Sequence, residues 1–588
     1  MINPFPPAFL FILGAVLIPI LKGKLKQLYL LMIPAIAFLD IIKLSPGMSW
    51  SYRFSGYDLV FCNVDRLSLI IGYIFVIIGF LAILYSIHVK EDGQHIAAFL
   101  YIGSSLGVVF SGDFFSLFVF WEIMAVASLF LILYQRKKES LGAGLRYILM
   151  HIIGGCSLLA GIIIYTISKG SIAIGIIEPN AAYWFLLLGI GLNTAFIPIH
   201  TWLPDAYPEG TITGSVFLSV FTTKTGVYVL ARCFPGVEFV AYMGGIMALY
   251  GVVFALLQND ARRLLSYHIV SQVGYMVAAV GVGTALSING AVAHVFNHIL
   301  YKALLFMSIG SVMYMTGKRK LTEMGGLARF MPVTTIVCII AALSISGAPG
   351  FNGFISKGMI LASVAEAHRP ILEIMLTLAS VGTFLSFIKL GYFAFFAKNY
   401  DMKSKESPVN MQLAMMLTAF ACVLIGLFPK ILFYILPYQD IPYHPYTPGH
   451  IVGVIQLFML AGASFILAKA MVVPHNATIL DFDYFYRMGG KVLIWVIMVP
   501  LSALRKKLQL FSSVTVSIIS RLAKNPISTI EIPIAYVYQR ITKGSRYVGG
   551  YSSSDTFNEN LYRKPVGVGI FLAIILLFVF ALVHLIFK

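Results

Sequence analysis

The sequence predicts an all-α protein that crosses a membrane many times, with about 14 to 16 transmembrane helices. Hydrophobic residues fill 59% of the 588 positions, charged residues fill only 11%, and the mean hydropathy is +0.88. Apolar stretches long enough to cross about 30 Å of hydrocarbon, about 20 residues each, recur along most of the chain. These features favour a polytopic membrane protein over a soluble one.

Fifteen apolar stretches follow one another from the N-terminus, and a sixteenth lies near the C-terminus. The expected spans are residues 8–21, 27–44, 66–88, 96–111, 114–134, 143–167, 182–203, 211–231, 239–257, 264–283, 288–315, 331–364, 371–397, 409–428, 451–472 and 567–587. Residues 489–545 instead mix apolar runs with Arg, Lys and Pro, which is typical of helices that lie along a membrane surface.

We expect five parts along the chain. They are N-terminal transmembrane helices (1–110), a core with both broken helices (111–365), C-terminal transmembrane helices (366–472), a lateral segment on the cytoplasmic side (473–566) and a final anchoring helix (567–588).

Lysine and arginine are distributed unevenly over the loops, and this predicts the orientation of the chain. One set of alternate loops carries sixteen, among them Lys22, Arg136 and Arg262, whereas the other carries six, among them Arg53 and Lys169. We place the first set in the cytoplasm, which puts the N-terminus outside the cell membrane. The same bias explains much of the net charge of +18 as topology and contact with anionic lipids, so no nucleic-acid partner is expected.

Helix breakers lie inside two of the spans. The run GLNTAFIPIHTWLPDAYPEG contains Pro198, and the run GAPGFNGFISKGMIL contains Gly347 and Pro349. Broken backbone at membrane depth is tolerated only against protein or a water-filled cavity, and transporters use such breaks to build ion sites. A simple kink or a loop boundary is the alternative interpretation.

Charged side chains in the middle of apolar spans give the strongest functional signal. These residues are Glu122, Lys224, Lys302, Lys357 and Lys389. A charge at this depth costs about 3 kcal/mol or more, so such residues usually mark an ion path. His294 and His298 precede Lys302 at four-residue spacing, which places all three on one helix face in register for a proton relay. For Lys389, a snorkelling membrane anchor is an equal alternative.

Six motifs in a fixed order point to a known family. They are FFSLFVFWEIM around Glu122, PIHTWLPDAYPEG from Pro198, TKTGVYVLAR from Thr223, NDARRLLSYHIVSQVGYM from Asn259, HVFNHILYKALLFMSIGSV from His294 and GAPGFNGFISK ending at Lys357. With these motifs the chain resembles the antiporter-like subunits of Mrp-type cation/proton antiporters, respiratory complex I and membrane-bound hydrogenases, with the greatest similarity to the D subunit of the Mrp complex. The resemblance covers about residues 110–365 and implies inverted five-helix repeats, each with one discontinuous helix.

The resemblance also implies roles for the charged residues. Glu122 matches the glutamate at the start of the proton path in these proteins, and Lys224 matches the central-axis lysine. Lys357 matches the position that exchanges the proton at the far end of the path. Lys389 matches no motif.

One position departs from the family pattern. The family usually has a lysine five residues before the proline that matches Pro198, and this lysine pairs with the glutamate that matches Glu122; here the position is Asn193. Glu122 is therefore expected to turn to Lys224, to stay protonated or to serve another cation.

Further titratable residues lie near this position in the predicted core. His268 is an auxiliary titratable candidate or a packing residue, and His151 and His200 are weaker candidates. Asp205 either lines a cation entrance or caps the next helix.

Three functions stay open at this point. The chain is an ion-translocating subunit of a multisubunit Na⁺/proton antiporter, the same module in a redox-driven complex, or a mainly structural subunit whose path has degenerated at Asn193. The five cysteines have no CxxC spacing, so no cofactor or metal site is expected, and the sequence does not decide whether the chain belongs to an enzyme. The expected partners are other membrane subunits, protons and Na⁺.

Overall fold

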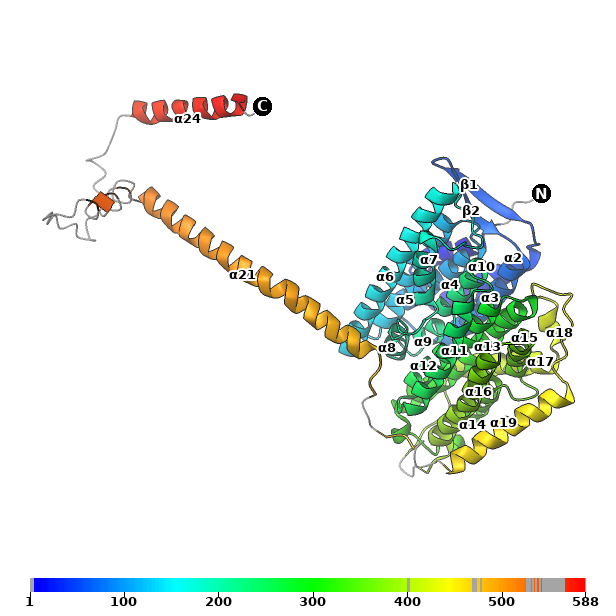
Figure 1. The fold of residues 1–588 in the computed structure, drawn as a ribbon. Helices are drawn as coiled ribbons and strands as arrows, with labels where there is room; N and C mark the ends of the chain where they lie inside the picture. The colour runs from blue at the N-terminus through cyan, green and yellow to red at the C-terminus, as the bar shows by residue number, and fades with distance from the viewer. Residues whose placement is uncertain are drawn as a thin grey trace. The chain divides into compact units, whose positions relative to one another are not determined.

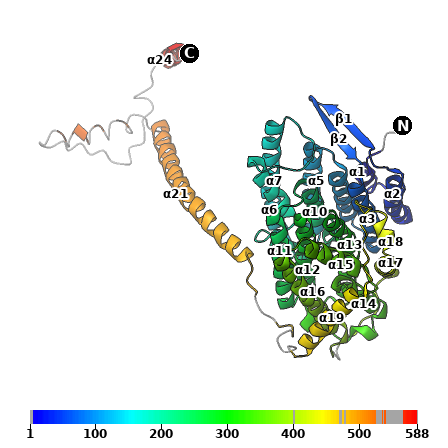
Figure 2. The same ribbon diagram turned by 45° about the vertical axis from the view of Figure 1, so that its right-hand side comes forward.

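The computed structural model describes residues 5–398, 402–467, 473–475, 479–524 and 566–586, together with positions 530, 534, 537, 538 and 541. These residues fall into two compact units, Met1–Asp483 and Tyr484–Lys588, which are described separately. Figures 1 and 2 show the first unit as a bundle of helices that carries one small hairpin.

The elements of the first unit follow the order of the apolar stretches. They are α1 (Pro7–Leu17), α2 (Gly23–Lys43), β1 (Ser49–Phe54), β2 (Tyr57–Asn63), α3 (Arg66–Ser86), α4 (Asp92–Phe110), α5 (Phe114–Leu133), α6 (Lys138–Lys169), α7 (Ala181–Asn193), α8 (Trp202–Ala206), η1 (Tyr207–Glu209), α9 (Gly214–Leu218), α10 (Thr222–Cys233), α11 (Glu238–Leu257), α12 (Ala261–Val282), α13 (Ala285–Thr316), η2 (Leu321–Glu323), η3 (Leu327–Arg329), α14 (Pro332–Ser346), α15 (Asn352–Glu366), α16 (Pro370–Gly391), η4 (Tyr392–Phe396), α17 (Val409–Leu427), α18 (Lys430–Phe433) and α19 (Pro448–Leu467).

The predicted multi-span helical fold class is confirmed. Within the described residues, thirteen helices are long and apolar enough to cross a membrane, and shorter apolar helices such as α1, α7 and α14 accompany them. Each predicted span coincides with a helix or with a pair of helices separated by a break. Long apolar runs specify these helices because, in hydrocarbon, a backbone must satisfy its hydrogen bonds within its own segment.

The structure corrects the all-α expectation at one place. Strands β1 and β2 form an antiparallel hairpin between α2 and α3, with Phe54 paired to Tyr57 across the turn. Ser55 and Gly56 both have positive φ (48° and 85°), the backbone that a two-residue hairpin turn requires. Asp113 holds the hairpin on the bundle, because its carboxylate accepts a hydrogen bond from the Val60 amide at 2.7 Å.

Both predicted helix breaks are present. Helix α7 ends at Asn193, well before α8 begins at Trp202, and α14 and α15 are separated by a turn in which Gly347 and Gly350 have positive φ. The span predicted over 211–231 is present as two helices, because α9 ends at Leu218 and α10 begins at Thr222. Neither proline nor glycine stands at this interruption, so no local signal in the sequence marks it.

Helices α10, α12 and α13 are among the most enclosed helices of the bundle. In their most apolar windows, 94% of the residues of the α9–α10 pair and of α12 are buried, as are 78% of those of α13. Helices α11 and α12 approach closely because Gly244 of α11 and Gly274 of α12 leave no side chain between the two backbones. The bundle core therefore contains the three helices that carry most of the predicted polar residues.

The second unit contains two long described helices. Helix α21 (Asp483–Lys524) runs for 42 residues with Pro500 inside it, and α24 (Val566–Ile586) coincides with the expected final span. Helix α21 lies within the predicted lateral segment, and none of its residues is buried. It is also one of the thirteen helices that are long and apolar enough to cross a membrane, so its lateral placement stays a prediction. Most of residues 525–565 lie outside the described part of the chain.

Candidate functional site

The side chain of Lys224 forms a hydrogen bond within the interruption between α9 and α10. It lies in the first turn of α10 with no exposed surface, and its ammonium donates a hydrogen bond to the Ser219 carbonyl at 2.6 Å. Because the helix is interrupted before α10, this carbonyl lacks a helical hydrogen-bond partner, and the ammonium of Lys224 takes that place. Tyr101 of α4 secures the same turn through a 2.6 Å hydrogen bond with Thr222.

The row of three titratable residues on α13 is present and fully buried. His294, His298 and Lys302 lie on successive turns of this helix, and each has no exposed surface. His294 contacts the Ser356 hydroxyl through Nδ1 at 3.0 Å and the Tyr301 hydroxyl through Nε2 at 3.3 Å. The rings of His294 and His298 are 6.2 Å apart. Neither ring nitrogen of His298 has a hydrogen-bond partner among the described residues.

His268 of α12 joins this row through Phe387 of α16. Its ring lies 4.7 Å from the Phe387 ring, and the ammonium of Lys302 lies 5.9 Å from the same ring. His268 is fully buried, and neither of its nitrogens has a partner in the described part of the chain. The structure therefore brings His268 and Lys302 to a shared aromatic side chain.

Lys357 follows the second break, on α15. Its ammonium lies 5.0 Å from the centre of the Tyr275 ring, and no hydrogen-bond partner for it occurs among the described residues. Ser356, its neighbour in sequence, carries the contact to His294. The break between α14 and α15 thus places Lys357 beside the row of α13.

The assembled cluster consists of basic side chains and has no acidic partner among the described residues. Lys224, Lys302 and Lys357 form no ion pair there, and Lys224, Lys302, His294 and Lys357 are all within electrostatic range of His298. A buried amine or imidazole without a partner is costly unless water reaches it.

Glu122 does not reach Lys224. Its carboxylate faces α6, where Gly155 leaves the space that it occupies; a side-chain carbon at Gly155 would collide with Oε1. No ion pair joins Glu122 to a lysine in the part of the chain that the structure describes. The residue is partly exposed on the same helix face as Val119 and Val126, both of which are exposed. Of the three expectations for Glu122, the turn toward Lys224 is therefore wrong.

Asn193 faces His151 of α6 instead of an acidic residue. Both side chains are buried, and neither makes a well-formed hydrogen bond among the described residues. The His151 ring is 4.7 Å from Trp202 and 4.2 Å from Tyr147. His151 was a weak candidate from the sequence because no motif includes it. Only the folded chain shows that His151, one turn before Gly155 on α6, lies opposite Asn193, the position at which the family usually has a lysine.

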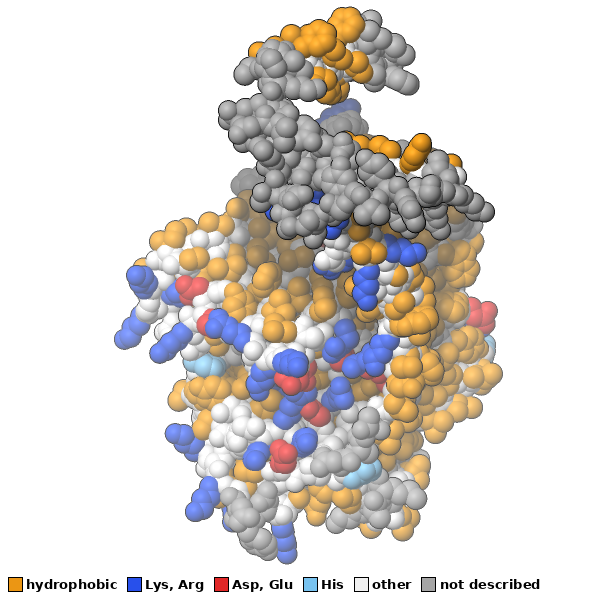
Figure 3. All heavy atoms as spheres, turned by 90° about the vertical axis from the view of Figure 1, so that its left-hand side faces the viewer, with side chains coloured by type: hydrophobic (Ala, Val, Ile, Leu, Met, Phe, Trp, Pro, Cys, Tyr) orange, Lys and Arg blue, Asp and Glu red, His pale blue; other side chains and the backbone are white. Residues whose placement is uncertain are grey.

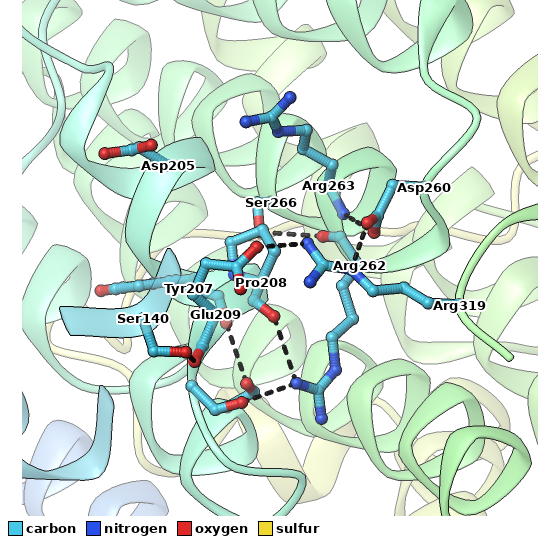
Figure 4. A network of polar contacts seen from close by, with 12 residues as sticks. Ser140, Asp205, Tyr207, Pro208, Glu209, Asp260, Arg262, Arg263, Ser266 and Arg319 are labelled. Atoms are coloured by element: carbon cyan, nitrogen blue, oxygen red, sulfur yellow. Dashed lines mark hydrogen bonds and ion pairs between the residues drawn. The ribbon is translucent and has the colours of Figure 1, made fainter. Parts of the chain in front are cut away.

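A network of ion pairs fixes the segment that follows the first break (Figure 4). Asp205 receives two hydrogen bonds from Arg146 of α6, at 2.6 and 3.0 Å, and Glu209 pairs with Arg319 at 2.8 Å. Arg262 of α12 is buried and donates to the Gly210 carbonyl at 2.8 Å. Figure 3 shows basic and acidic side chains gathered together on one face, with hydrophobic side chains around them.

The capping alternative for Asp205 was wrong. Asp205 lies within α8, and the N-cap position of the next α-helix, α9, is Thr213. Its carboxylate instead ties the segment after the first break to α6 through Arg146. The role of Asp205 at a cation entrance stays a prediction.

Lys389 has a different environment from the other buried lysines. Only 2% of it is exposed, and its ammonium donates to the Leu256 carbonyl at 2.5 Å. Leu256 stands in the last turn of α11, where carbonyls lack helical partners. This contact lies at the end of a helix, and the snorkelling alternative for Lys389 stays a prediction.

A contact that the sequence did not suggest joins the first break to the segment after α19. Asp481 accepts hydrogen bonds from Tyr250 and Tyr267, both at 2.5 Å, and lies 3.4 Å from Nε2 of His200. These partners hold the pKa of the Asp481 carboxyl at about 2, against the raising effect of burial. His200 belongs to the broken segment between α7 and α8.

The comparisons with known proteins agree with this fold. Residues 111–386 match the family model described as NADH:quinone oxidoreductase/Mrp antiporter, TM. The chain is 32% identical over 425 residues to the A subunit of a Na(+)/H(+) antiporter of Alkalihalophilus pseudofirmus, covering 63% of this chain and 53% of the relative. It is 29% identical over 484 residues to the A1 subunit of a Na(+)/H(+) antiporter of Staphylococcus haemolyticus, covering 71% of this chain and 60% of that protein. The chain thus spans between half and two thirds of the length of these relatives.

Two solved structures share the fold. A chain of the Mrp complex from Dietzia sp. DQ12-45-1b superposes with a TM-score of 0.67 at 18% identity, covering 77% of this chain and 97% of that one. A chain of the membrane-bound sulfane sulfur reductase, an archaeal respiratory membrane complex, superposes with a TM-score of 0.68 at 23% identity, covering 92% and 99%.

Proposed function

We propose that this chain, whose residues 111–386 carry the transmembrane module of the NADH:quinone oxidoreductase/Mrp antiporter family, is an ion-translocating subunit of a multisubunit Na⁺/proton antiporter. The observation that carries the proposal is the buried cluster of Lys224, His298, Lys302 and Lys357, which spans two helix breaks without an acidic partner among the described residues. The names of the relatives, all Na(+)/H(+) antiporter subunits, support it.

The proposed mechanism is a proton relay through water along α13. Lys224 takes up a proton at the interruption between α9 and α10, His298 and His294 pass it together with Lys302, and Lys357 exchanges it beyond the break between α14 and α15. Because the positive groups are close and unscreened, a charge on one disfavours a charge on the next. A cation that enters one end therefore expels a proton from the neighbouring site, and this repulsion couples the two flows.

Glu122 and His151 form the proposed entry. Glu122 lies at the edge of the bundle against Gly155, and His151 is one turn away on the same helix as Gly155. We propose that the imidazole of His151, beside Asn193, replaces the lysine that the family usually has on α7. A proton then passes from Glu122 to Lys224 by way of α6.

The finer assignments rest on weaker support. The motifs favour the D subunit of the Mrp complex, whereas the aligned relatives are named as A and A1 subunits. We therefore propose an antiporter-like subunit, and the composition of its complex will determine which subunit it is. The exposed apolar surface of α21 supports partnership with other membrane subunits. The excess of Lys and Arg in alternate loops supports an N-terminus outside the cell membrane. We retain the proposed parts at 1–110, 111–365, 366–472, 473–566 and 567–588.

A redox-driven complex is the second candidate, because the family description also names NADH:quinone oxidoreductase. The two candidates differ in what energises transport. The complex that contains this chain should exchange Na⁺ for protons in sealed vesicles without any electron donor if the antiporter proposal is right.

The test uses the assembled complex in proteoliposomes with a pH-sensitive dye inside. We expect Lys302→Gln and Lys357→Gln to abolish Na⁺-dependent proton movement, while Lys318→Gln, at an exposed lysine in the loop after α13, leaves it unchanged. Full activity of both buried-site variants would instead identify a structural subunit with a degenerate path.

A further inference from the structure

A small cavity lies directly beyond Lys357. Its volume is about 30 Å³, and its polar lining consists of Lys357, Ser346, Ser380 and His450. A cavity needs about 10 to 15 Å³ and some polar partners to hold one water molecule, so this one has room for water between the ammonium and the imidazole. The remaining lining comes mainly from apolar residues of α15, α16 and α19.

His450 is held in a defined orientation at this cavity. It lies in the first turn of α19, and its ring stacks on Phe354 of α15 with 4.2 Å between centroids and 16° between planes. Its Nδ1 lies 2.8 Å from the Pro445 carbonyl, which can only accept, so Nδ1 carries the proton of this hydrogen bond. In the neutral ring, Nε2 is then left with its lone pair free to accept a proton.

Gly358 permits the close approach of this ring to α15. A side-chain carbon at position 358 would lie 2.8 Å from Nε2 of His450 and 2.6 Å from the Tyr443 hydroxyl. Helix α15 therefore has no side chain at the residue after Lys357, and the imidazole of His450 occupies that space. A histidine that served only to pack against Phe354 would not need a polar cavity beside it.

We propose that His450 is the proton acceptor at the outlet of the path, and that water in this cavity connects it to Lys357. The proposal rests on the function proposed above and extends it by one residue. The Lys357 ammonium gives a proton to the cavity water, which gives one to Nε2 of His450. The imidazolium then releases a proton to the aqueous side on which α19 begins, and the neutral ring is restored.

The surroundings of His450 suit this transfer. Three titratable groups face it: Lys357 from α15, Tyr443, whose hydroxyl lies against Gly358, and Tyr446. The ring centroids of Tyr446 and Phe354 are 5.2 Å apart. None of them is acidic, so no described carboxylate traps the proton on the ring. His450 itself is half-buried, so it both lines the cavity and has a part that is exposed.

The test compares three variants in the assembled complex, reconstituted in proteoliposomes. His450→Ala removes the base, His450→Phe keeps a ring to stack on Phe354, and His444→Ala is the matched control, because His444 is an exposed histidine of the preceding loop. We expect both His450 variants to slow Na⁺-dependent proton movement about tenfold or more, the loss typical of a missing proton-transfer base. The control should keep the wild-type rate.

Free imidazole distinguishes proton transfer from packing. Added on the outlet side, it should restore much of the rate of His450→Ala, because a small base can occupy the vacated space, and it should not restore Lys357→Ala. Wild-type rates in His450→Phe together with a loss in Lys357→Ala would overturn the role of His450 and leave the proposed function intact. Unchanged exchange in Lys357→Ala would overturn the proposed function itself.

Discussion

The ammonium of Lys224 and the carbonyl of Ser219 are joined by a 2.6 Å hydrogen bond across the interruption between α9 and α10. The same side chain thus stabilises a break in the backbone and supplies a charge at the centre of the bundle. A change in the protonation of Lys224 alters the strength of this bond, since a hydrogen bond from an ammonium is stronger than one from a neutral amine. The protonation of Lys224 and the local backbone structure are therefore linked.

Replacement of Lys224 should separate its two roles. Lys224→Ala leaves the Ser219 carbonyl without its partner and should destabilise the protein by about 1 to 3 kcal/mol. Lys224→Gln can still donate from a neutral amide and should be less destabilising, yet both variants should lose exchange in proteoliposomes. Thermal unfolding of the purified protein in detergent measures the first effect. Equal stability of the two variants would show that the bond to Ser219 contributes little.

The position of Glu122 should depend on Gly155. Gly155→Ala inserts a methyl group into the space of Oε1 and should displace the carboxylate, reducing exchange about tenfold or more, as expected for a misplaced proton-transfer group. Gly462→Ala on α19 is the control, because an added side-chain carbon there would have no heavy atom within 4 Å. The exchange rates of both variants are measured in proteoliposomes. A wild-type rate in Gly155→Ala would show that exchange does not depend on this placement.

His151 and Asn193 should act as a pair. We expect His151→Gln to lower the exchange rate, and Asn193→Lys in that background to recover part of it, because the ammonium replaces the titratable group that was removed. A double-mutant cycle on the vesicle rates measures their coupling. The exposed His475 provides a control through His475→Gln. Strictly additive effects would argue against a shared function.

Asp481 should make the attachment of its segment sensitive to acid. Its pKa is lowered from 3.8 to about 2 in the folded protein, so its contribution is fully present above about pH 4 and is lost as the pH falls toward 2. The ionised Asp481 carboxylate should therefore contribute about 2 kcal/mol to the free energy of unfolding. Asp481→Asn should therefore open residues 479–483 to limited proteolysis at pH 7, with the difference from wild type shrinking toward pH 2.

The exposed Asp58 of β2 offers a matched carboxylate, and Asp58→Asn should leave proteolysis of residues 479–483 unchanged. Proteolysis that is equally slow in wild type and Asp481→Asn at neutral pH would contradict the anchoring role of Asp481.

Local features were predictable from the sequence, and non-local ones were not. The runs of apolar residues predicted the spans, because each helix in a bilayer is specified by its own segment. The four-residue spacing of His294, His298 and Lys302 predicted their common face, because helical geometry alone determines it. The interruption at 219–221 was missed, since it contains no helix breaker and depends on the lysine that occupies its freed carbonyl.

The sequence by itself determined that this is a many-span membrane protein with charged residues at depth, and it named most members of the buried cluster. Only the tertiary structure decided which of them meet. Glu122 packs against Gly155 and forms no ion pair with Lys224 among the described residues, Asn193 meets His151, and Asp481, which follows α19 in the chain, reaches His200. The physical reason is that periodicity determines the face of a helix on which a residue lies, whereas the group opposite it depends on how helices distant in sequence pack.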